Sequence, residues 1–476
     1  MNIEQKDKER IVLALAAIII IALSWQFYAR DATYWWDEST YIGIGRFIET
    51  RGEIGFWENF RPPIIPLTIA ILEIFKIPAP FERLIVSTTF SILLFFLTIK
   101  LAKKTEKETA HWALLLLLSA PVIIKLSPRL LSDIPSTAII ALSAILLFSN
   151  KKIPAGIIHG IAIMTRFPQI IYTPAFLLYI WHEAVIQKTR ESIIKSTKKS
   201  IQYIIGISII LAPYMIFQKI KFGSFTHFMF YAQEVPKIGS AKLFPTISTF
   251  YFSYLTMTAI LLPALIIGII YYAKNYKTEK EGVFLTTATI LMIGYLTQFP
   301  YREDRFLVMA MPFIAVISAK GLKIIINIAK NFKTENAILA IAVIIITMMI
   351  GQGIAQAKIS MGEYTSQEKE YYKKISEIKT QKGQIILMAE TDALALTRQK
   401  IKFLGGIQYA IGELKRLKPI TAAFAWNNCT YACPANDEKC EKEKILFNEE
   451  LEKMRISWKE KIGNCALTIY EISDEK

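Results

Sequence analysis

Long apolar blocks constrain the fold of this chain more than any other feature. Runs such as 11–27, 84–101, 201–217 and 337–350 contain almost no charged residue. Each is close to the roughly 20 residues that a helix needs to cross a hydrocarbon core. Lipid cannot satisfy free backbone groups, so helices are the expected spanning structure. With 53% hydrophobic and only 20% charged residues, the chain is predicted to be a polytopic membrane protein. One large soluble enzyme could not bury so many uncharged runs.

Basic residues are concentrated in the short loops between the apolar blocks. The formal net charge is +16, which on a soluble protein would indicate a nucleic-acid partner. Basic residues favour cytoplasmic loops of membrane proteins, so here they indicate topology, and no nucleic-acid partner is predicted. The first block follows a charged segment and lacks a cleavage pattern, which predicts a retained span and a cytoplasmic N-terminus. The basic loop residues are Lys103, Lys104, Lys107, Lys151, Lys152, Lys188, Arg190, Lys195, Lys198, Lys199, Lys274, Lys277, Lys280, Lys320, Lys323, Lys330 and Lys333.

Placing these loops in the cytoplasm predicts about eleven spanning helices and an extracytoplasmic C-terminus. The apolar segment 62–76 would reverse the sides of all later loops if it spanned. We therefore expect it to form a helix at the outer membrane surface. The predicted spans are 11–30, 83–101, 109–126, 135–150, 154–166, 168–183, 201–219, 251–273, 283–299, 305–320 and 336–353.

The predicted fold class is an all-α polytopic membrane protein with outer-surface helices and a small C-terminal α/β domain. Residues 1–357 would form the transmembrane domain, with outer loops at 31–83 and 222–250. Residues 358–476 would form an extracytoplasmic soluble domain, because charged residues become frequent after Met361. In this tail, strands are expected at 384–389, 421–426 and 465–472, and helices near 368–379 and 439–461.

All four cysteines lie in the tail, at Cys429, Cys433, Cys440 and Cys465. An even number of cysteines in one extracytoplasmic domain predicts two disulfides, with three possible pairings. A zinc site is the alternative, since thiolates bind zinc well, but the cysteine spacing does not match a familiar zinc pattern.

Charged residues on the predicted outer side are the candidates for chemistry. Asp37 and Glu38 follow the aromatic run 34–36; they are either acids of an active site or solvated acids beside an aromatic belt. Arg61 precedes two prolines that stiffen the chain, and it could bind a phosphate where the next helix begins. An arginine between apolar runs either needs a partner such as a lipid phosphate or extends to the headgroups. Further candidates at outer turns are Arg129, Asp133, Arg166, Arg302, Glu303 and Arg305.

These residue types fit one class of reaction. An outward-facing site has no supply of cytoplasmic nucleotide sugars, but it can use a sugar carried across the membrane on a lipid phosphate. Such a donor needs a base for the acceptor and cations for the departing phosphate.

The motifs together resemble the GT-C superfamily of glycosyltransferases that use polyprenyl-phosphate sugars, and most closely its protein O-mannosyltransferase and aminoarabinose-transferase branch. The resemblance runs from the first span to about residue 320. In that family an acidic pair follows the first span, and Lys or His precedes two prolines, where this chain has Arg. The matching residues are Asp37 and Glu38, then Arg61 with Pro62 and Pro63, then Asp133, and finally 302–306 with Pro312.

The resemblance implies an inverting transfer from a polyprenyl- or dolichyl-phosphate sugar to a protein, lipid or glycan acceptor. Asp37 would be the general base, with Glu38 beside it, and Asp133 and Glu303 would position the acceptor or a metal. Some relatives hold a divalent metal near the acids, although no His or Cys cluster here requires one. The residues implied to bind the donor phosphate are Arg61, Arg129, Arg166, Arg302 and Arg305.

Two other functions fit a polytopic membrane protein. A transporter or lipid flippase without transferase activity predicts inverted repeats and helices broken at the midplane; no convincing repeat is found, and the charges gather at one face. A non-catalytic scaffold whose tail binds a partner would leave the arginines and acids of the outer turns unexplained.

The topology can be tested with single cysteines at Ser196 and Ser366 in a protein lacking native thiols. We expect an impermeant thiol reagent to label the Ser366 position in intact cells and to leave the Ser196 position unlabelled. Labelling at Ser196 without labelling at Ser366 would reverse the map.

Overall fold

The computed structural model describes residues 5–58, 61–227, 261–298, 303–381, 383–388, 390–403, 412, 414, 416–417, 420–428 and 438–471. The chain forms two compact units. We call Met1–Phe27 with Arg83–Ser360 the helical unit, and Tyr28–Glu82 with Met361–Lys476 the loop–tail unit.

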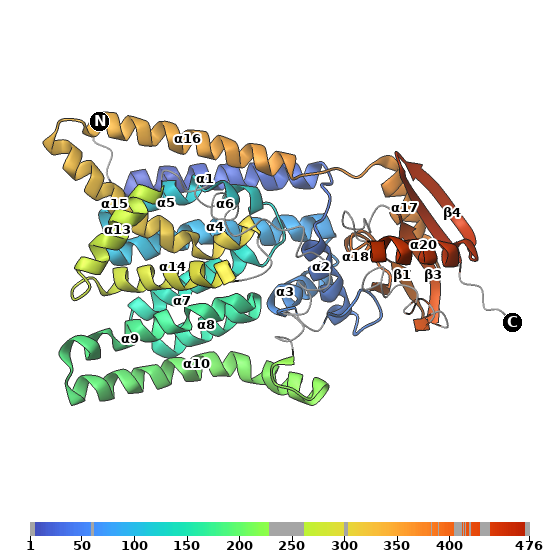
Figure 1. The fold of residues 1–476 in the computed structure, drawn as a ribbon, viewed down its shortest axis with the longest axis horizontal. Helices are drawn as coiled ribbons and strands as arrows, with labels where there is room; N and C mark the ends of the chain where they lie inside the picture. Colours follow the sequence, from blue (N-terminus) through green and yellow to red (C-terminus); the bar gives the residue numbers. More distant parts are fainter. Residues whose placement is uncertain are drawn as a thin grey trace. The chain divides into compact units, whose positions relative to one another are not determined.

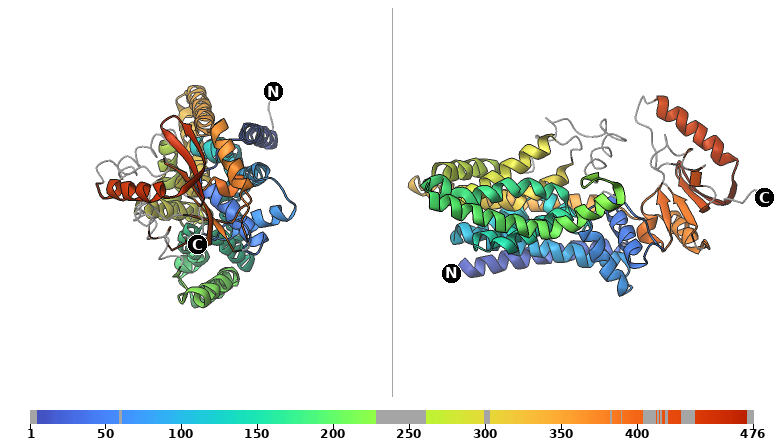
Figure 2. Two further views of the ribbon diagram at one scale, coloured as in Figure 1. Left: turned by 90° about the vertical axis from the view of Figure 1, so that its right-hand side faces the viewer. Right: turned by 90° about the horizontal axis from the view of Figure 1, so that it is seen from below.

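The helical unit consists of helices that run alongside one another (Figures 1 and 2). Five helices in the described part of the chain are long and apolar enough to cross a membrane: α1 (Gln5–Ala29), α4 (Ala79–Thr105), α10 (Arg190–Phe222), the continuous η3–α15 (Asp304–Asn331) and α16 (Glu335–Ile359). The protein is therefore an integral membrane protein with a mostly helical fold, and the count of eleven spans stays a prediction. The remaining elements are η1 (Lys107–Thr109), α5 (Ala110–Leu118), α6 (Pro121–Leu126), α7 (Asp133–Phe148), α8 (Lys152–Thr165), η2 (Phe167–Tyr172), α9 (Thr173–Gln187), α13 (Leu261–Lys274) and α14 (Lys280–Gln298).

Glycines allow close packing of helices in this unit. A Cβ atom on Gly156 of α8 would lie 2.1 Å from the carbonyl oxygen of Tyr203 in α10. A Cβ on Gly321 of α15 would lie 1.8 Å from the carbonyl oxygen of Ala264 in α13. Small residues at such crossings bring helix backbones together, which is how helices associate where lipid supplies no hydrophobic driving force.

The loop–tail unit combines two helices of the first loop with a small α/β sheet. The sheet order is β2-β1-β3-β5-β4. Strand β1 pairs in parallel with β2 and β3, and β5 pairs antiparallel with β3 and β4. Phe447 and Leu451 of α20 pack on Phe424 and Trp426 of the sheet. The elements are α2 (Trp36–Glu49), α3 (Ile64–Ile74), α17 (Ser366–Glu377), β1 (Ile385–Met388), α18 (Ala393–Leu396), β2 (Ile401–Phe403), β3 (Thr421–Asn427), α20 (Glu438–Glu452), β4 (Arg455–Ile462) and β5 (Cys465–Glu471).

The predicted extent of one helix in the tail is partly wrong. The sequence predicts a helix over 439–461, but α20 ends at Glu452 and Arg455–Ile462 is strand β4. The charged residues of this segment conceal an edge strand, in which exposed positions tolerate Lys and Glu. Its register with β5, ending at Ile462 opposite Cys465, makes a tight hairpin.

The first loop and the tail are bonded to each other directly. Ala32 bridges to Glu363, and Gly55 bridges to Lys400. The ring of Phe403 contacts the rings of Trp36 and Phe56. Segments in such contact lie on the same side of the membrane, so an even number of crossings must separate them. The predicted map places ten of its eleven spans there.

Cys465, one of the four cysteines predicted to form disulfides, begins β5 at the turn of the β4–β5 hairpin. Cys465 is disulfide-bonded; Cys429 and Cys433, and the side chain of Cys440, lie outside the described residues. We expect Cys465→Ser to destabilise the tail, because removal of a native disulfide from a small domain costs about 2–5 kcal/mol. Limited proteolysis should then cleave the tail faster than in the wild-type protein. Non-reduced peptide mass analysis showing four free thiols, or bound zinc, would contradict the prediction.

Candidate active site

Asp37, Glu58 and Arg61 form a compact charge cluster in the loop–tail unit, which we call the acid–arginine cluster. Arg61 Nη1 donates to Asp37 Oδ1 at 2.6 Å, and Arg61 Nε donates to Glu58. The guanidinium also lies over the ring of Tyr41, 5.4 Å from its centroid. Asp37 stands in the first turn of α2, and Arg61 precedes the two prolines that lead into α3. The local sequence therefore delivers the acid and the cation from two different elements.

The cluster is largely shielded from solvent, with side chains 11–16% exposed. Burial alone would lower the pKa of Arg61, but the carboxylates of Glu58 and Asp37 outweigh it and raise that pKa. Burial raises the pKa of Glu58; Arg61 opposes this shift, and Asp37 adds to it. One permanent cation thus faces two acids.

Glu38 has a different structural position from its neighbour. Its side chain accepts a hydrogen bond from the backbone N–H of Trp35 at 2.8 Å, and the residue is fully buried. It forms part of a capping box at the N-terminus of α2. Such a cap satisfies N–H groups that the helix itself cannot. This contact fixes the first turn that carries Asp37, and a catalytic role for Glu38 stays a prediction.

A metal ion at the acid–arginine cluster would have to displace Arg61. Arg61 lies against both carboxylates of the acid–arginine cluster. Within the described ranges, no group of three or more His, Cys, Asp or Glu side chains could hold an ion. A divalent metal stays a prediction.

A second set of charges lies at helix ends of the helical unit, and we call it the Phe306 cluster: Asp133, Arg166, Glu303, Arg305 and Phe306. Arg166 pairs with Asp133 at 3.1 Å and donates to Ser132 Oγ at 3.0 Å. Its guanidinium lies 4.9 Å from the ring centroid of Phe306, and that of Arg305 lies 5.2 Å from it. Arg305 also pairs with Glu303. The guanidinium groups of Arg166 and Arg305 thus both contact the ring of Phe306, and each is also paired with a carboxylate.

The ends of the helices suit these charges. Asp133 is in the first turn of α7, and Arg166 caps the C-terminus of α8; the helix dipole favours an acid at the first position and a cation at the second. A guanidinium has five N–H donors, so an ion pair with one carboxylate leaves capacity for a phosphate.

Two other predicted arginines have different outcomes. Arg129 is only 2% exposed. It donates to the carbonyl oxygen of Ser360 and lies 4.8 Å from the ring centroid of Phe27, so it connects parts of the helical unit. Arg302 lies outside the described residues.

Sequence reasoning missed four charged residues of the loop–tail unit: Glu58 of the acid–arginine cluster, and Arg46, Glu73 and Arg398, which pair with one another. Glu58 matches the family motif poorly, although an acid three residues before an arginine is a visible signal. Arg46 and Glu73 are buried charges inside apolar helices, which is a signal that each has a partner. Arg398 in the tail donates to Glu73, which lies 325 positions earlier in the chain. No local sequence pattern indicates a contact between residues so far apart.

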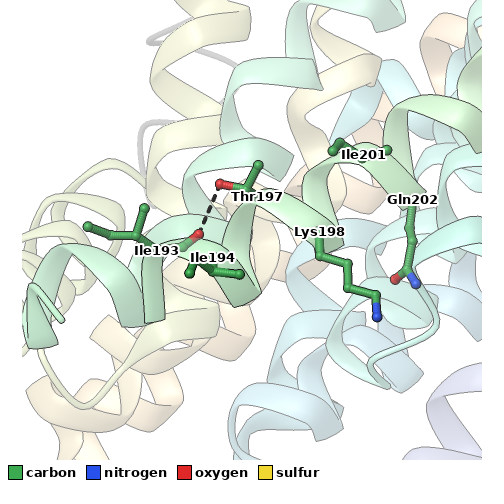
Figure 3. Close-up of a pocket in the computed structure, with 6 residues that line it drawn as sticks. All are labelled: Ile193, Ile194, Thr197, Lys198, Ile201 and Gln202. Carbon is green, nitrogen blue, oxygen red and sulfur yellow. Dashed lines mark hydrogen bonds between the residues drawn. The ribbon is translucent and has the colours of Figure 1, made fainter. Parts of the chain in front are cut away.

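A shallow pocket lies elsewhere, along one face of α10 (Figure 3). It is lined by Ile193, Ile194, Thr197, Lys198, Ile201 and Gln202. None of these is a predicted site residue.

Comparison with protein families identifies the chain. The model of the Alg9-like mannosyltransferase family matches residues 60–388, more than half of the sequence. The chain belongs to this family. It is therefore a glycosyltransferase, as the GT-C resemblance predicted. Among curated proteins, no sequence gives a significant match to this Alg9-like enzyme.

Solved structures share the fold of this Alg9-like enzyme. ArnT from Cupriavidus metallidurans bound to undecaprenyl phosphate has a TM-score of 0.68 at 10% identity, over 98% of each chain. The apo Archaeoglobus fulgidus oligosaccharyltransferase has a TM-score of 0.62 at 12% identity, over 88% of this chain and 69% of that one. AglB from Archaeoglobus fulgidus, with an inhibitory peptide and a dolichol-phosphate, has a TM-score of 0.57 at 11% identity, over 98% and 74%. At these identities the likeness establishes the fold.

The raised pKa of Glu58 predicts how its removal changes stability with pH. A carboxyl group whose pKa is raised by folding binds its proton more tightly in the folded protein than in the unfolded one. Its contribution to the free energy of unfolding is therefore fully present below the ordinary pKa and is lost as pH rises through the folded-state pKa. Glu58→Gln mimics the protonated form, so we expect it to raise the melting temperature relative to wild type at neutral pH.

That difference should shrink as the pH is lowered through the range in which Glu58 gains its proton. Thermal unfolding in detergent at a series of pH values measures it, and Glu460→Gln on the exposed face of β4 is the control. A Glu58→Gln protein that is less stable than wild type at neutral pH would contradict the assignment.

Proposed function

We propose that this enzyme transfers a hexose of the mannose type from a polyprenyl- or dolichyl-phosphate donor to an acceptor at the extracytoplasmic face, with inversion at the sugar. The observation that carries the proposal is the hydrogen bond of 2.6 Å between Arg61 Nη1 and Asp37 Oδ1. It holds a carboxylate in one orientation in a shielded cluster, as a general base requires.

In the proposed reaction the acceptor hydroxyl gives its proton to Asp37 while its oxygen attacks the anomeric carbon. The bond from that carbon to the phosphate oxygen breaks, and the lipid phosphate leaves with the electron pair. A single displacement of this kind inverts the configuration at the anomeric carbon. A carboxylate has about four lone-pair positions, so an acid that accepts a hydrogen bond from Arg61 can also accept a proton.

Arg61 has a narrower role in this proposal than sequence reasoning gave it. It faces two carboxylates, so an added phosphate would have to compete with both of them. We therefore assign Arg61 to orienting Asp37, and its role as a phosphate seat stays a prediction.

Arg166 and Arg305 stay the residues predicted to bind the donor phosphate. Both are about nine-tenths shielded, and hydrogen bonds from guanidinium to phosphate strengthen where water is excluded. A lipid-phosphate donor is supported by relatives of the same fold, whose structures contain undecaprenyl phosphate and dolichol-phosphate. For the acceptor, a protein is one candidate, since a related oligosaccharyltransferase was solved with an acceptor peptide; lipid and glycan remain the others.

The base can be tested with Asp37→Asn, which keeps shape and removes basicity. We expect mannose transfer from dolichyl-phosphate mannose to acceptors in a membrane extract to fall about 10²–10⁴-fold, the usual contribution of a general base. Donor binding should persist, because Asp37 does not hold the phosphate.

Asp31→Asn is the matched control, since Asp31 lies in the same unit, half-exposed and paired with Lys369. It should transfer at the wild-type rate. If Asp37→Asn also does so, another group is the base, and Glu58 and Asp133 are the next acids to replace.

A further inference from the structure

A buried carboxylate joins the first loop to the tail. Glu73, near the end of α3, is 1% exposed. Its Oε1 accepts from Arg46 Nε at 2.6 Å, and its Oε2 accepts from Arg398 Nη1 at 2.7 Å. Each carboxylate oxygen thus has its own guanidinium, one from α2 and one from the tail. We call Arg46, Glu73 and Arg398 the clamp.

The tail adds further contacts to the clamp. Arg46 is 4% exposed, and its Nη1 donates to the carbonyl oxygens of Leu394 and Thr397, both at 2.7 Å. Its charge is therefore satisfied from α3 on one side and from the tail backbone on the other. Removing a partner from such a buried pair leaves an uncompensated charge, which is strongly destabilising. Arg398 is different, since its side chain is 48% exposed.

The clamp and the acid–arginine cluster link the same two chain segments. Asp37 and Arg46 stand near the beginning and the end of α2, whereas Arg61 and Glu73 stand just before α3 and near its end. The order of charges is reversed between the two pairs, because α2 supplies the acid to the first and the cation to the second. Shifting one helix along the other would bring like charges together, so the two pairs define a single alignment.

Close packing makes this alignment stiff. A Cβ atom on Gly45 of α2 would lie 2.5 Å from Cγ2 of Ile69 in α3, and one on Gly43 would lie 2.7 Å from Cδ1 of Leu394 in the tail. These contacts adjoin the clamp, because Gly45 precedes Arg46 and because Arg46 donates to the carbonyl oxygen of Leu394. We expect a displacement at Glu73 to be passed along α2 or α3 to the segment that carries Asp37 or Arg61.

We propose that Arg46 and Arg398, acting through Glu73, are positioning residues for the Asp37–Arg61 pair, so that the tail is a working part of the catalytic apparatus. The inference rests on the proposed function, because it assigns the clamp to the alignment of the proposed base. It identifies the residues through which a tail distant in sequence controls that base.

Arg398 is the residue to change, because its exposure lets the protein fold without it. In full-length enzyme, we expect Arg398→Ala to lower kcat for transfer from dolichyl-phosphate mannose by about 10- to 100-fold, the effect of a displacement on the order of 1 Å. Donor KM and melting temperature should stay near the wild-type values. Arg398→Lys should recover part of the rate, since it restores charge without the planar fork.

The matched control is Arg455→Ala. Arg455 pairs with Glu471 at 3.5 Å in the same unit, on the exposed β4–β5 hairpin, and its loss should leave kcat unchanged. Hydrogen exchange supplies a readout that is independent of activity. Arg398→Ala should speed exchange in peptides covering 36–58, and Arg455→Ala should not.

A double variant separates this inference from the proposed function. If Arg398 acts through Asp37, adding Arg398→Ala to Asp37→Asn should cause little further loss of rate, because coupled residues are not additive. If the rate losses of the two single variants add fully in the double variant, the positioning role is overturned. A wild-type kcat in Arg398→Ala would also overturn it, whether or not hydrogen exchange is faster. A normal rate in Asp37→Asn alone, with faster exchange and a lower kcat in Arg398→Ala, would instead overturn Asp37 as the base.

Discussion

The hydrocarbon core of the membrane is the constraint on which this structure depends. Because lipid cannot hydrogen-bond to a free peptide group, the chain crosses it as helices, and polar chemistry is confined to helix ends and to the segments between them. Both charged clusters follow that rule. Asp133 and Arg166 stand at helix termini, and Asp37, Glu58 and Arg61 belong to the segment between the first two long helices. A carboxylate and a guanidinium brought together there are largely shielded from solvent.

Much of this organisation can be predicted from the sequence, because its causes are local. Apolar blocks indicate spans, and basic loops indicate their direction. The acids at 37–38 and the arginine at 61 belong to one loop, so their proximity is a short-range expectation. In the structure Arg61 donates directly to Asp37, and their roles as base and phosphate seat stay predictions. The family match to residues 60–388 agrees with the motifs that suggested a GT-C enzyme.

What the sequence does not reveal depends on contacts between distant residues or on competing local roles. Glu38 has the same chemistry as Asp37, yet it caps α2 through the N–H of Trp35, and only the backbone geometry distinguishes the two acids. Strand β4 is rich in charge, so its pairing with β5 is set by the sheet and not by its own pattern. The junction of the first loop with the tail is the largest omission. No periodic sequence pattern predicts the Gly55–Lys400 bridge or the Arg398–Glu73 pair.

The distance between Glu73 and Arg398 along the chain also sets an order of events during synthesis. The two residues are 325 positions apart, and translation adds roughly 5–20 residues per second, so Glu73 exists for roughly 15–65 s before its second cation is made. In that interval every intervening span is inserted while α2 and α3 can be joined by Arg46 alone. The contacts of Glu73 are therefore completed only after Arg398 has been made, and a ribosome that stops before that residue releases a chain without them.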